Sequence, residues 1–218
     1  LDINRAIEKN IGQLDFYNDY SFQNKIDTSS FVKGLEHNKI VFINGRIEKI
    51  DFKSEDNNKI EIIEESNLSN KFNNINSLIN LNNAFTNKNY KINVKENYSL
   101  KKPLIVYHLT TNKIYKKNIN LRLNFNLGSN SSLRLIDYFE DNSKDNFINI
   151  FYNFELEKNS SLKNYKIDHK DNKNVKYSFN NIDQKENSIS ETFILSSGSS
   201  FFKSEINCDL NGQHSSAF

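Results

Sequence analysis

The sequence contains one proline, one cysteine and six glycines, and neither methionine nor tryptophan. A single cysteine excludes a framework of internal disulfides, so a reducing compartment is expected. No Gly-x-x-x-x-Gly-Lys loop occurs, and no apolar run approaches the ~20 residues that cross a membrane. The first residues also lack the apolar stretch of a signal peptide. We therefore expect a cytoplasmic protein, or one of an organelle stroma or matrix if a transit peptide precedes this sequence.

The net charge and the fraction of hydrophobic residues are low as well. The formal net charge is +2, and basic and acidic residues are interleaved without a basic block, which argues against nucleic-acid binding. Hydrophobic residues make up 36% of the chain, below the usual ~45–50%, so a single globular core would be thin. An elongated fold with a narrow core fits better. Because methionine is absent even at position 1, we expect a fragment, cut at the N-terminus and, given the final strand pattern, at the C-terminus.

The first half of the chain predicts mixed secondary structure. Residues 1–32 carry apolar positions spaced by four, four and three, which predicts a helical N-terminal region. The stretch KIVFINGRIEKI, Lys39–Ile50, predicts a β-hairpin around its Asn-Gly pair. Asn73–Phe85 has the spacing of a short amphipathic helix with asparagines available for capping. We assign residues 33–100 to a mixed segment that contains this hairpin and this helix.

The second half contains an internal repeat. The segment NFNLGSNSSL, which begins at Asn124, realigns on NFELEKNSSL 29 residues later. If successive units stack like on like, Phe125 lies on Phe154 inside the fold and Asn130 lies on Asn159 at a turn, where side-chain amides form ladders. We expect both phenylalanines to be buried in a shared layer.

Short strands separated by Asn, Ser and Gly turns suit either a β-sandwich or a solenoid. The repeat favours the solenoid. We therefore predict a mainly β protein in which residues 101–218 form the core of a parallel β-helix that is incomplete at its C-terminus. The open edge of such a fragment predicts self-association.

The end of the chain holds the only cysteine and a nearby histidine. Cys208 shares its strand parity with Ile206 and Leu210, so we expect it to face the core, where burial raises the pKa of a thiol and makes it inert. His214 lies in a Gly-Gln-His-Ser turn, and a surface position is the favoured interpretation. The alternatives are a catalytic thiol with its base and half of a metal site.

Other candidates for chemistry are few. His37, His108 and His169 are far apart and show no metal-ligand spacing, so no metal site is predicted, although convergence across coils stays open. Asp137 is the one acid inside a strong strand pattern, and we expect it to point outward into solvent. A polysaccharide-acting enzyme would need such acids to converge on an exposed groove. We predict no catalytic residues, and cofactor-binding residues stay unknown.

Four short motifs, taken in order, resemble the SufB/SufD family of iron–sulfur cluster assembly proteins. They are an Asn-x-Ala-Phe segment, an Ile-x-Val strand, a Pro-Leu-x-Val strand and a Leu-x-Gly end, at Asn82–Phe85, Ile92–Val94, Pro103–Val106 and Leu210–Gly212. The resemblance covers most of the chain from about residue 40 onward. It implies a helical N-terminal region, a right-handed parallel β-helix and a helical C-terminal domain.

Within that family the chain is similar to SufD. SufB proteins carry a sulfur-receiving cysteine just after the strand that matches SSLRLIDYFE, whereas here Glu140 is followed by Asp141, Asn142 and Ser143. The resemblance implies a non-enzymatic scaffold that pairs with SufB-like and SufC-like subunits in a SufBCD complex, with ATP hydrolysis left to SufC. It implies no cofactor bound by this fragment, although the complex assembles iron–sulfur clusters. A structural β-solenoid module is a further alternative.

Overall fold

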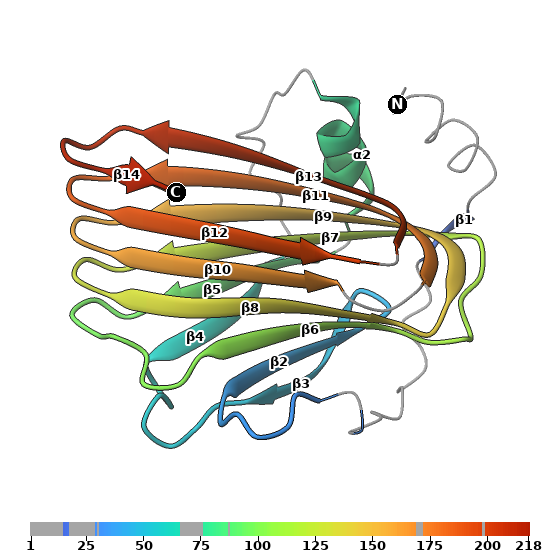
Figure 1. The fold of residues 1–218 in the computed structure, drawn as a ribbon, viewed down its shortest axis with the longest axis horizontal. Helices are drawn as coiled ribbons and strands as arrows, with labels where there is room; N and C mark the ends of the chain where they lie inside the picture. The colour runs from blue at the N-terminus through green and yellow to red at the C-terminus, as the bar shows by residue number, and fades with distance from the viewer. Residues whose placement is uncertain are drawn as a thin grey trace.

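The computed structural model describes residues 15–17, 29, 31–65, 76–86, 88–168, 172–197 and 199–218. In these residues the chain winds back and forth between two facing sheets whose strands run mostly parallel to their neighbours (Figure 1). The prediction of a mainly β, parallel solenoid is therefore confirmed.

The two sheets share the strands as follows. The first contains β4 (Ile60–Glu65), β5 (Asn89–Val94), β7 (Lys117–Leu127), β9 (Lys144–Leu156), β11 (Asn172–Gln184) and β13 (Ser199–Leu210), with β1 (Asp15–Phe16) beside β7. The second contains β3 (Arg46–Asp51), β2 (Asn38–Ile43), β6 (Leu104–Thr110), β8 (Ser132–Asp141), β10 (Ser161–Asp168), β12 (Ile189–Ser196) and β14 (Ser216–Ala217). The pairs β6–β7, β8–β9, β10–β11 and β12–β13 thus form successive coils.

Local signals in the first half of the chain behave as predicted. β2 and β3 pair as an antiparallel hairpin, and Asn44 and Gly45 at its turn have φ angles of 51° and 83°, as a type I′ turn requires. The predicted helix is α2 (Ser77–Phe85), and Asn76 caps it by accepting a hydrogen bond from the backbone N–H of Leu78. Most of residues 1–32, where a helical region was predicted, lie outside the described residues. Within the described part the prediction is wrong at β1, because Asp15–Phe16 pair as a strand with β7.

Helix α2 lies on the outer face of the first sheet. Its Leu78 and Ile79 pack against Phe147 and Phe151 of β9. Asn82 is fully buried, and its side-chain amide donates to the backbone oxygens of Leu121 and Asn149 at 3.1 and 3.0 Å. The asparagine of the Asn-x-Ala-Phe segment therefore ties the helix to β7 and β9 together.

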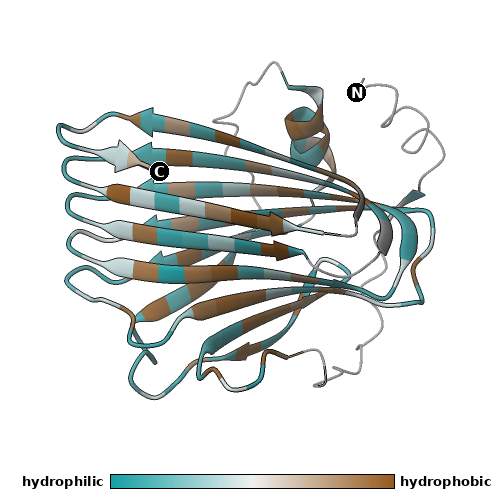
Figure 2. Ribbon diagram, in the orientation of Figure 1, coloured by the Kyte–Doolittle hydropathy of each residue, from teal (hydrophilic) through white to brown (hydrophobic). Residues whose placement is uncertain are grey.

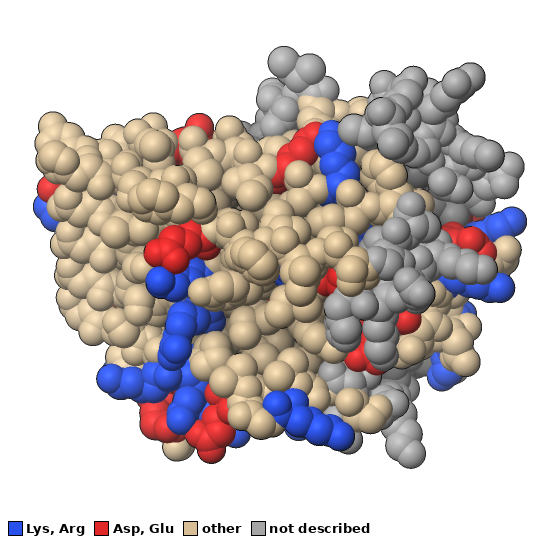
Figure 3. Space-filling model, viewed as in Figure 1, with Lys and Arg blue, Asp and Glu red and all other residues tan. Residues whose placement is uncertain are grey.

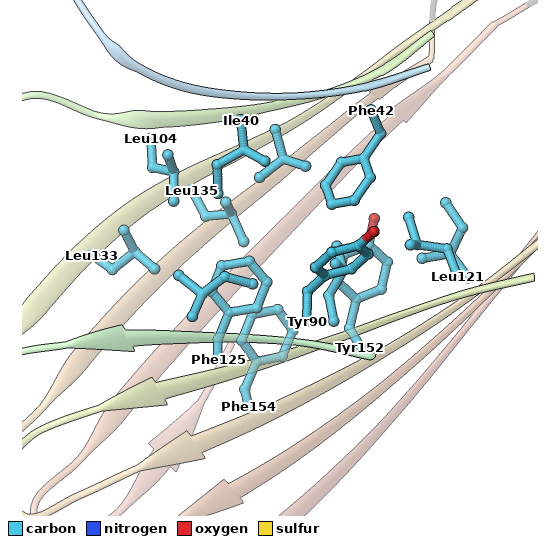
Figure 4. Packing of buried hydrophobic residues seen from close by; sticks show 14 of the residues in the cluster. Ile40, Phe42, Tyr90, Leu104, Leu121, Phe125, Leu133, Leu135, Tyr152 and Phe154 are labelled. Carbon is cyan, nitrogen blue, oxygen red and sulfur yellow. The ribbon is translucent and has the colours of Figure 1, made fainter. Parts of the chain in front are cut away.

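Like residues stack inside the solenoid. Phe125 and Phe154 are fully buried, and their ring centroids lie 5.2 Å apart in a stacked arrangement (Figure 4). The same column continues through Ile92 before them and through Ile182 and Cys208 after them. The register predicted from the repeat is confirmed. Figure 2 shows the bands of alternating hydropathy along the strands that result from this inward–outward alternation.

Each coil turns through the same backbone conformation. Asn97, Asn130, Asn159, Asn187 and His214 all have φ between 54° and 59°. Asparagine tolerates this left-handed region better than most residues, which accounts for its recurrence in the repeat. Side-chain amides join the first three of these asparagines in a ladder with 2.8 Å hydrogen bonds. His214 occupies the corresponding position of the last turn and is exposed there, as predicted.

Truncation of the stacked aromatic layer should destabilise the fold strongly. We expect Phe154→Ala to lower the free energy of unfolding by about 3–5 kcal/mol, because it leaves a cavity beside Phe125. Urea unfolding followed by circular dichroism measures this. The matched control is Phe193→Ala, which removes a ring that is 57% exposed and should cost far less. Equal losses in the two variants would contradict the stacked register.

Candidate functional site

Among the residues that the structure describes, six histidine, aspartate and lysine side chains lie inside the solenoid between the two sheets. None of them is more than 7% exposed, and they are His108, Asp137, Asp141, Lys166, Asp168 and Lys176. A charge removed from water is costly unless another charge and hydrogen bonds compensate it. The contacts of this group, which we call the lumen cluster, are therefore the first place to look for function.

One half of the lumen cluster is centred on Asp137. The Nζ atom of Lys166 lies 2.8 Å from one carboxylate oxygen, and the Nε2 atom of His108 lies 3.4 Å from the other. The hydroxyl of Tyr152 is 3.0 Å from the same imidazole nitrogen, and the Lys166 ammonium sits 3.5 Å from the centre of the Tyr152 ring. Asp137 is thus compensated on two sides, and Lys166 gains a cation–π contact as well.

The other half is centred on Lys176 of β11. Its ammonium lies 2.9 Å from a carboxylate oxygen of Asp141 and 2.9 Å from one of Asp168. Asp141 also accepts a hydrogen bond from the Thr110 hydroxyl at 3.1 Å. The ammonium is 5.1 Å from the ring centre of Phe139. These contacts join β6, β8, β10 and β11 across the lumen.

The expectation that Asp137 points outward is wrong. Strand alternation places Asp137 on the inward face of β8 together with Leu135 and Phe139, and its exposure is zero. In the parallel register its neighbour on β10 is Lys166, 29 residues later, which is the offset of the sequence repeat. A buried acid is tolerated here because the residue at that same offset, Lys166, carries the opposite charge.

Burial and neighbouring charges set the protonation states. Burial between the stacked rings of Phe42 and Phe139 lowers the pKa of His108, so the imidazole is neutral. Burial alone would raise the pKa of Asp137, but the Lys166 ammonium and the hydrogen bonds from Lys166 and His108 outweigh it and hold that pKa below its usual value. The ionised Asp137 therefore faces Lys166 as its counter-charge, beside a neutral His108.

A small cavity adjoins the cluster. It has a volume of about 20 Å³ and is lined by His108, Thr110 and Asp141 together with apolar side chains that include Leu121 and Ile150. This is room for a single water molecule, and its three polar neighbours could hydrogen-bond to one. The cavity does not offer space for a larger substrate.

The other residues singled out in the sequence do not join this cluster. Cys208 faces the lumen in register with Ile182, as predicted, and burial raises the pKa of its thiol. His37 hydrogen-bonds through Nε2 to the Tyr107 hydroxyl at 2.9 Å. His169 lies outside the described residues.

The chemistry open to the cluster is limited by its closure. Asp137 is enclosed and paired with a lysine, so it is not an acid on an exposed groove, and a polysaccharide-cleaving arrangement gains no support from it. Among the residues that the structure describes, no group of three or more His, Cys, Asp or Glu side chains could hold a metal ion. In the same residues no helix is long and apolar enough to span a membrane. What the cluster can do is fix the register of the coils.

Sequence reasoning missed Lys166, Lys176 and their partners as a group. For the Asp137–Lys166 pair the repeat offset was a usable signal. For Lys176 there was none, because it meets Asp141 and Asp168 from the opposite sheet.

Comparison with known proteins gives one family match. A family model for the SufBD core domain of the SUF system of FeS cluster assembly matches residues 108–218, just over half of the chain. A search of curated proteins found no match. The matched segment begins at His108 and contains all six residues of the lumen cluster.

Removing one partner of the buried pair should be far costlier than removing both. We expect Lys166→Met to lower the free energy of unfolding by about 3–5 kcal/mol, since it leaves the Asp137 carboxylate buried without its ammonium. In the double variant that also carries Asp137→Leu, most of the lost unfolding free energy should be regained. The control is Lys163→Met on the same strand, which breaks only the exposed bridge to Glu191 and should cost at most about 1 kcal/mol. Urea unfolding of the four proteins checks this, and a double variant no more stable than the single one would contradict it.

The free energy of unfolding should decrease as the pH is lowered, and His108 should account for part of that decrease. The pKa of His108 is lowered in the folded chain, so below about 6.5 the unfolded chain binds more protons and folding is disfavoured. The lowered pKa of Asp137 adds a further loss as the pH falls below about 3.8. We expect His108→Gln to flatten the dependence of unfolding free energy on pH between about 7.5 and 5.5, which is about one pH unit to either side of an ordinary imidazole pKa. His214→Gln is the matched control and should keep the wild-type slope. A slope unchanged by His108→Gln would contradict a neutral, buried imidazole.

Proposed function

This chain belongs to the SufBD core family of the SUF iron–sulfur cluster assembly system, and on that basis we propose that it is a SufD-like scaffold subunit. In this role it pairs through its β-helix with a SufB-like subunit and works with a SufC-like ATPase. The iron–sulfur cluster is the cargo that the complex builds, and no resident cofactor is assigned to this chain.

The observation that carries the proposal is the family match over residues 108–218, which span the coils of the solenoid from β6 onward. A parallel β-helix offers long, regular sheet faces and edges on which other subunits can be held in fixed positions. The buried ion pairs support this role as well, because they specify one register of the coils. A rigid scaffold needs a single, fixed register of its coils more than it needs catalytic groups of its own.

The cysteine pattern favours SufD over SufB. β8 ends at Asp141, and Asn142 and Ser143 follow, so no thiol stands where the sulfur-receiving cysteine of SufB is expected. The only cysteine, Cys208, faces the lumen at the end of the Phe125–Phe154 column. With its pKa raised by burial, this thiol is a poor nucleophile. We assign it to packing.

The remaining aspects of the role follow from the same assignment. The chain is non-enzymatic, and ATP hydrolysis belongs to the SufC-like subunit. It acts in the cytoplasm, or in an organelle stroma or matrix. Among the described residues β13 is the outermost strand of the first sheet, and without partners an exposed sheet edge of this kind favours self-association.

Co-expression with SufB-like and SufC-like subunits tests the proposal. We expect the tagged chain to recover both partners under reducing conditions, and we expect the three-subunit complex to assemble clusters that are seen by absorbance and iron content. Failure to recover either partner from a folded chain would contradict the assignment.

A cysteine variant in the same experiment separates the two branches of the family. Cys208→Ser should leave the cluster yield of the complex unchanged, because a packing residue takes no part in sulfur transfer. The matched control replaces the cysteine of the SufB-like partner and should abolish assembly. Loss of assembly in Cys208→Ser, with partner binding intact, would point to a SufB-like role instead.

A further inference from the structure

The two halves of the lumen cluster are not in direct contact. Among the residues that the structure describes, no hydrogen bond or ion pair joins the side chains around Asp137 to those around Lys176. On the outer surface, acidic and basic side chains lie side by side where bulk water reaches them (Figure 3). The enclosed cluster has no such supply, so its unused hydrogen-bonding capacity has to be met inside the fold.

One carboxylate oxygen of Asp141 has such unused capacity. The Oδ1 atom accepts a hydrogen bond from the Thr110 hydroxyl at 3.1 Å. The Oδ2 atom lies 2.9 Å from the Lys176 ammonium, but the contact lacks the geometry of a hydrogen bond, so this buried oxygen receives none. Because a carboxylate oxygen has two lone pairs, Oδ2 is open to a donor.

His108 has a second open acceptor in the other half of the cluster. Both polar contacts of its imidazole involve Nε2, which is 3.4 Å from Asp137 and 3.0 Å from the Tyr152 hydroxyl. An ionised carboxylate only accepts, so in the neutral ring the proton is assigned to Nε2. The Nδ1 atom is then an acceptor, and no described residue donates to it.

The small cavity beside the cluster is bordered by both of these residues. His108, Thr110 and Asp141 line it, and they are only 6%, 5% and 7% exposed. Its volume of about 20 Å³ holds one water molecule, for which about 10–15 Å³ is enough. A water molecule carries two protons, so a single one donates to two acceptors at once. An empty cavity would leave both acceptors without a donor, which is costly in a buried site.

We propose that this cavity binds one ordered water molecule, which donates to Nδ1 of His108 and to Oδ2 of Asp141. The Thr110 hydroxyl is its third polar neighbour. This water joins the two halves of the lumen cluster into one hydrogen-bonded network that runs from Lys166 to Lys176. The inference rests on the geometry of the lumen and does not depend on the SufD-like assignment.

NMR of the unmodified chain tests whether the water is there. Methyl groups of Leu121 and Ile150, which line the cavity, should show cross-peaks to a water molecule that tumbles with the protein. The matched controls are methyl groups of Leu133 and Leu162, which are equally buried but do not line the cavity and should show none. Missing cross-peaks at Leu121 and Ile150 would overturn the proposal.

The ¹⁵N signals of His108 test whether the water donates to it. We expect a protonated Nε2 and an unprotonated Nδ1 whose chemical shift is that of a nitrogen that accepts a hydrogen bond. A protonated Nδ1, or one with the shift of an unbonded nitrogen, would overturn the proposed bridge.

Two variants test the contact with Asp141. Asp141→Leu and Asp168→Leu each remove one of the two carboxylates around Lys176, but only Asp141 lines the cavity. In chains shown by circular dichroism to be folded, Asp141→Leu should lose the water cross-peaks and move the Nδ1 signal of His108 towards its unbonded value. Asp168→Leu should change neither. The same change in both variants, or in neither, would overturn the role of Asp141. These readouts need no assembly partner, so they fail or succeed separately from the co-expression test.

Discussion

Parallel pairing between coils is the constraint on which the rest of this molecule depends. It holds residues that are 26 to 33 positions apart in the chain beside one another, coil after coil. A one-residue slip would exchange the inward and outward faces of a strand and would expose the aromatic column. Because the backbone alone does not choose among registers, the side chains must do so. Stacked rings, asparagine ladders and buried ion pairs all serve that purpose here.

The lumen cluster explains why so polar a sequence folds into a solenoid. Along one inward column the residues are Ile40, Val106, Asp137, Lys166 and Ile194, so one charged pair lies between apolar residues of the coils before and after it. A hydrophobic fraction of 36% would leave a thin apolar core, yet paired charges fill part of the lumen instead. Ion pairs of this kind contribute little net stability compared with apolar side chains of similar size, but a shift that separated Lys166 from Asp137 would leave a buried charge without its partner.

Features that depend on local pattern or on the repeat could be predicted from the sequence. Contacts between strands that are distant in the chain could not. The Asn-Gly hairpin, the helix that ends at Phe85 and the Phe125–Phe154 layer all follow from short stretches or from one offset. The position of Asp137 was misjudged because its residue type was given more weight than its strand parity. The pairing of Lys176 with Asp141 crosses the lumen between sheets, and no spacing in the chain encodes it.

The length of a coil also sets a time scale for how the chain folds as it is made. Each coil docks only on its neighbour, so the loop that must close contains about one coil of chain, and its entropy cost is nearly the same for every coil. At about 5–20 residues per second, a ribosome supplies a new coil roughly every 1–6 s. Even β-rich domains with mostly non-local pairing fold in about milliseconds to seconds, so the pairing of one coil fits within that interval. Each finished coil therefore has ample time to settle onto the one before it, and the order of synthesis becomes the order of assembly.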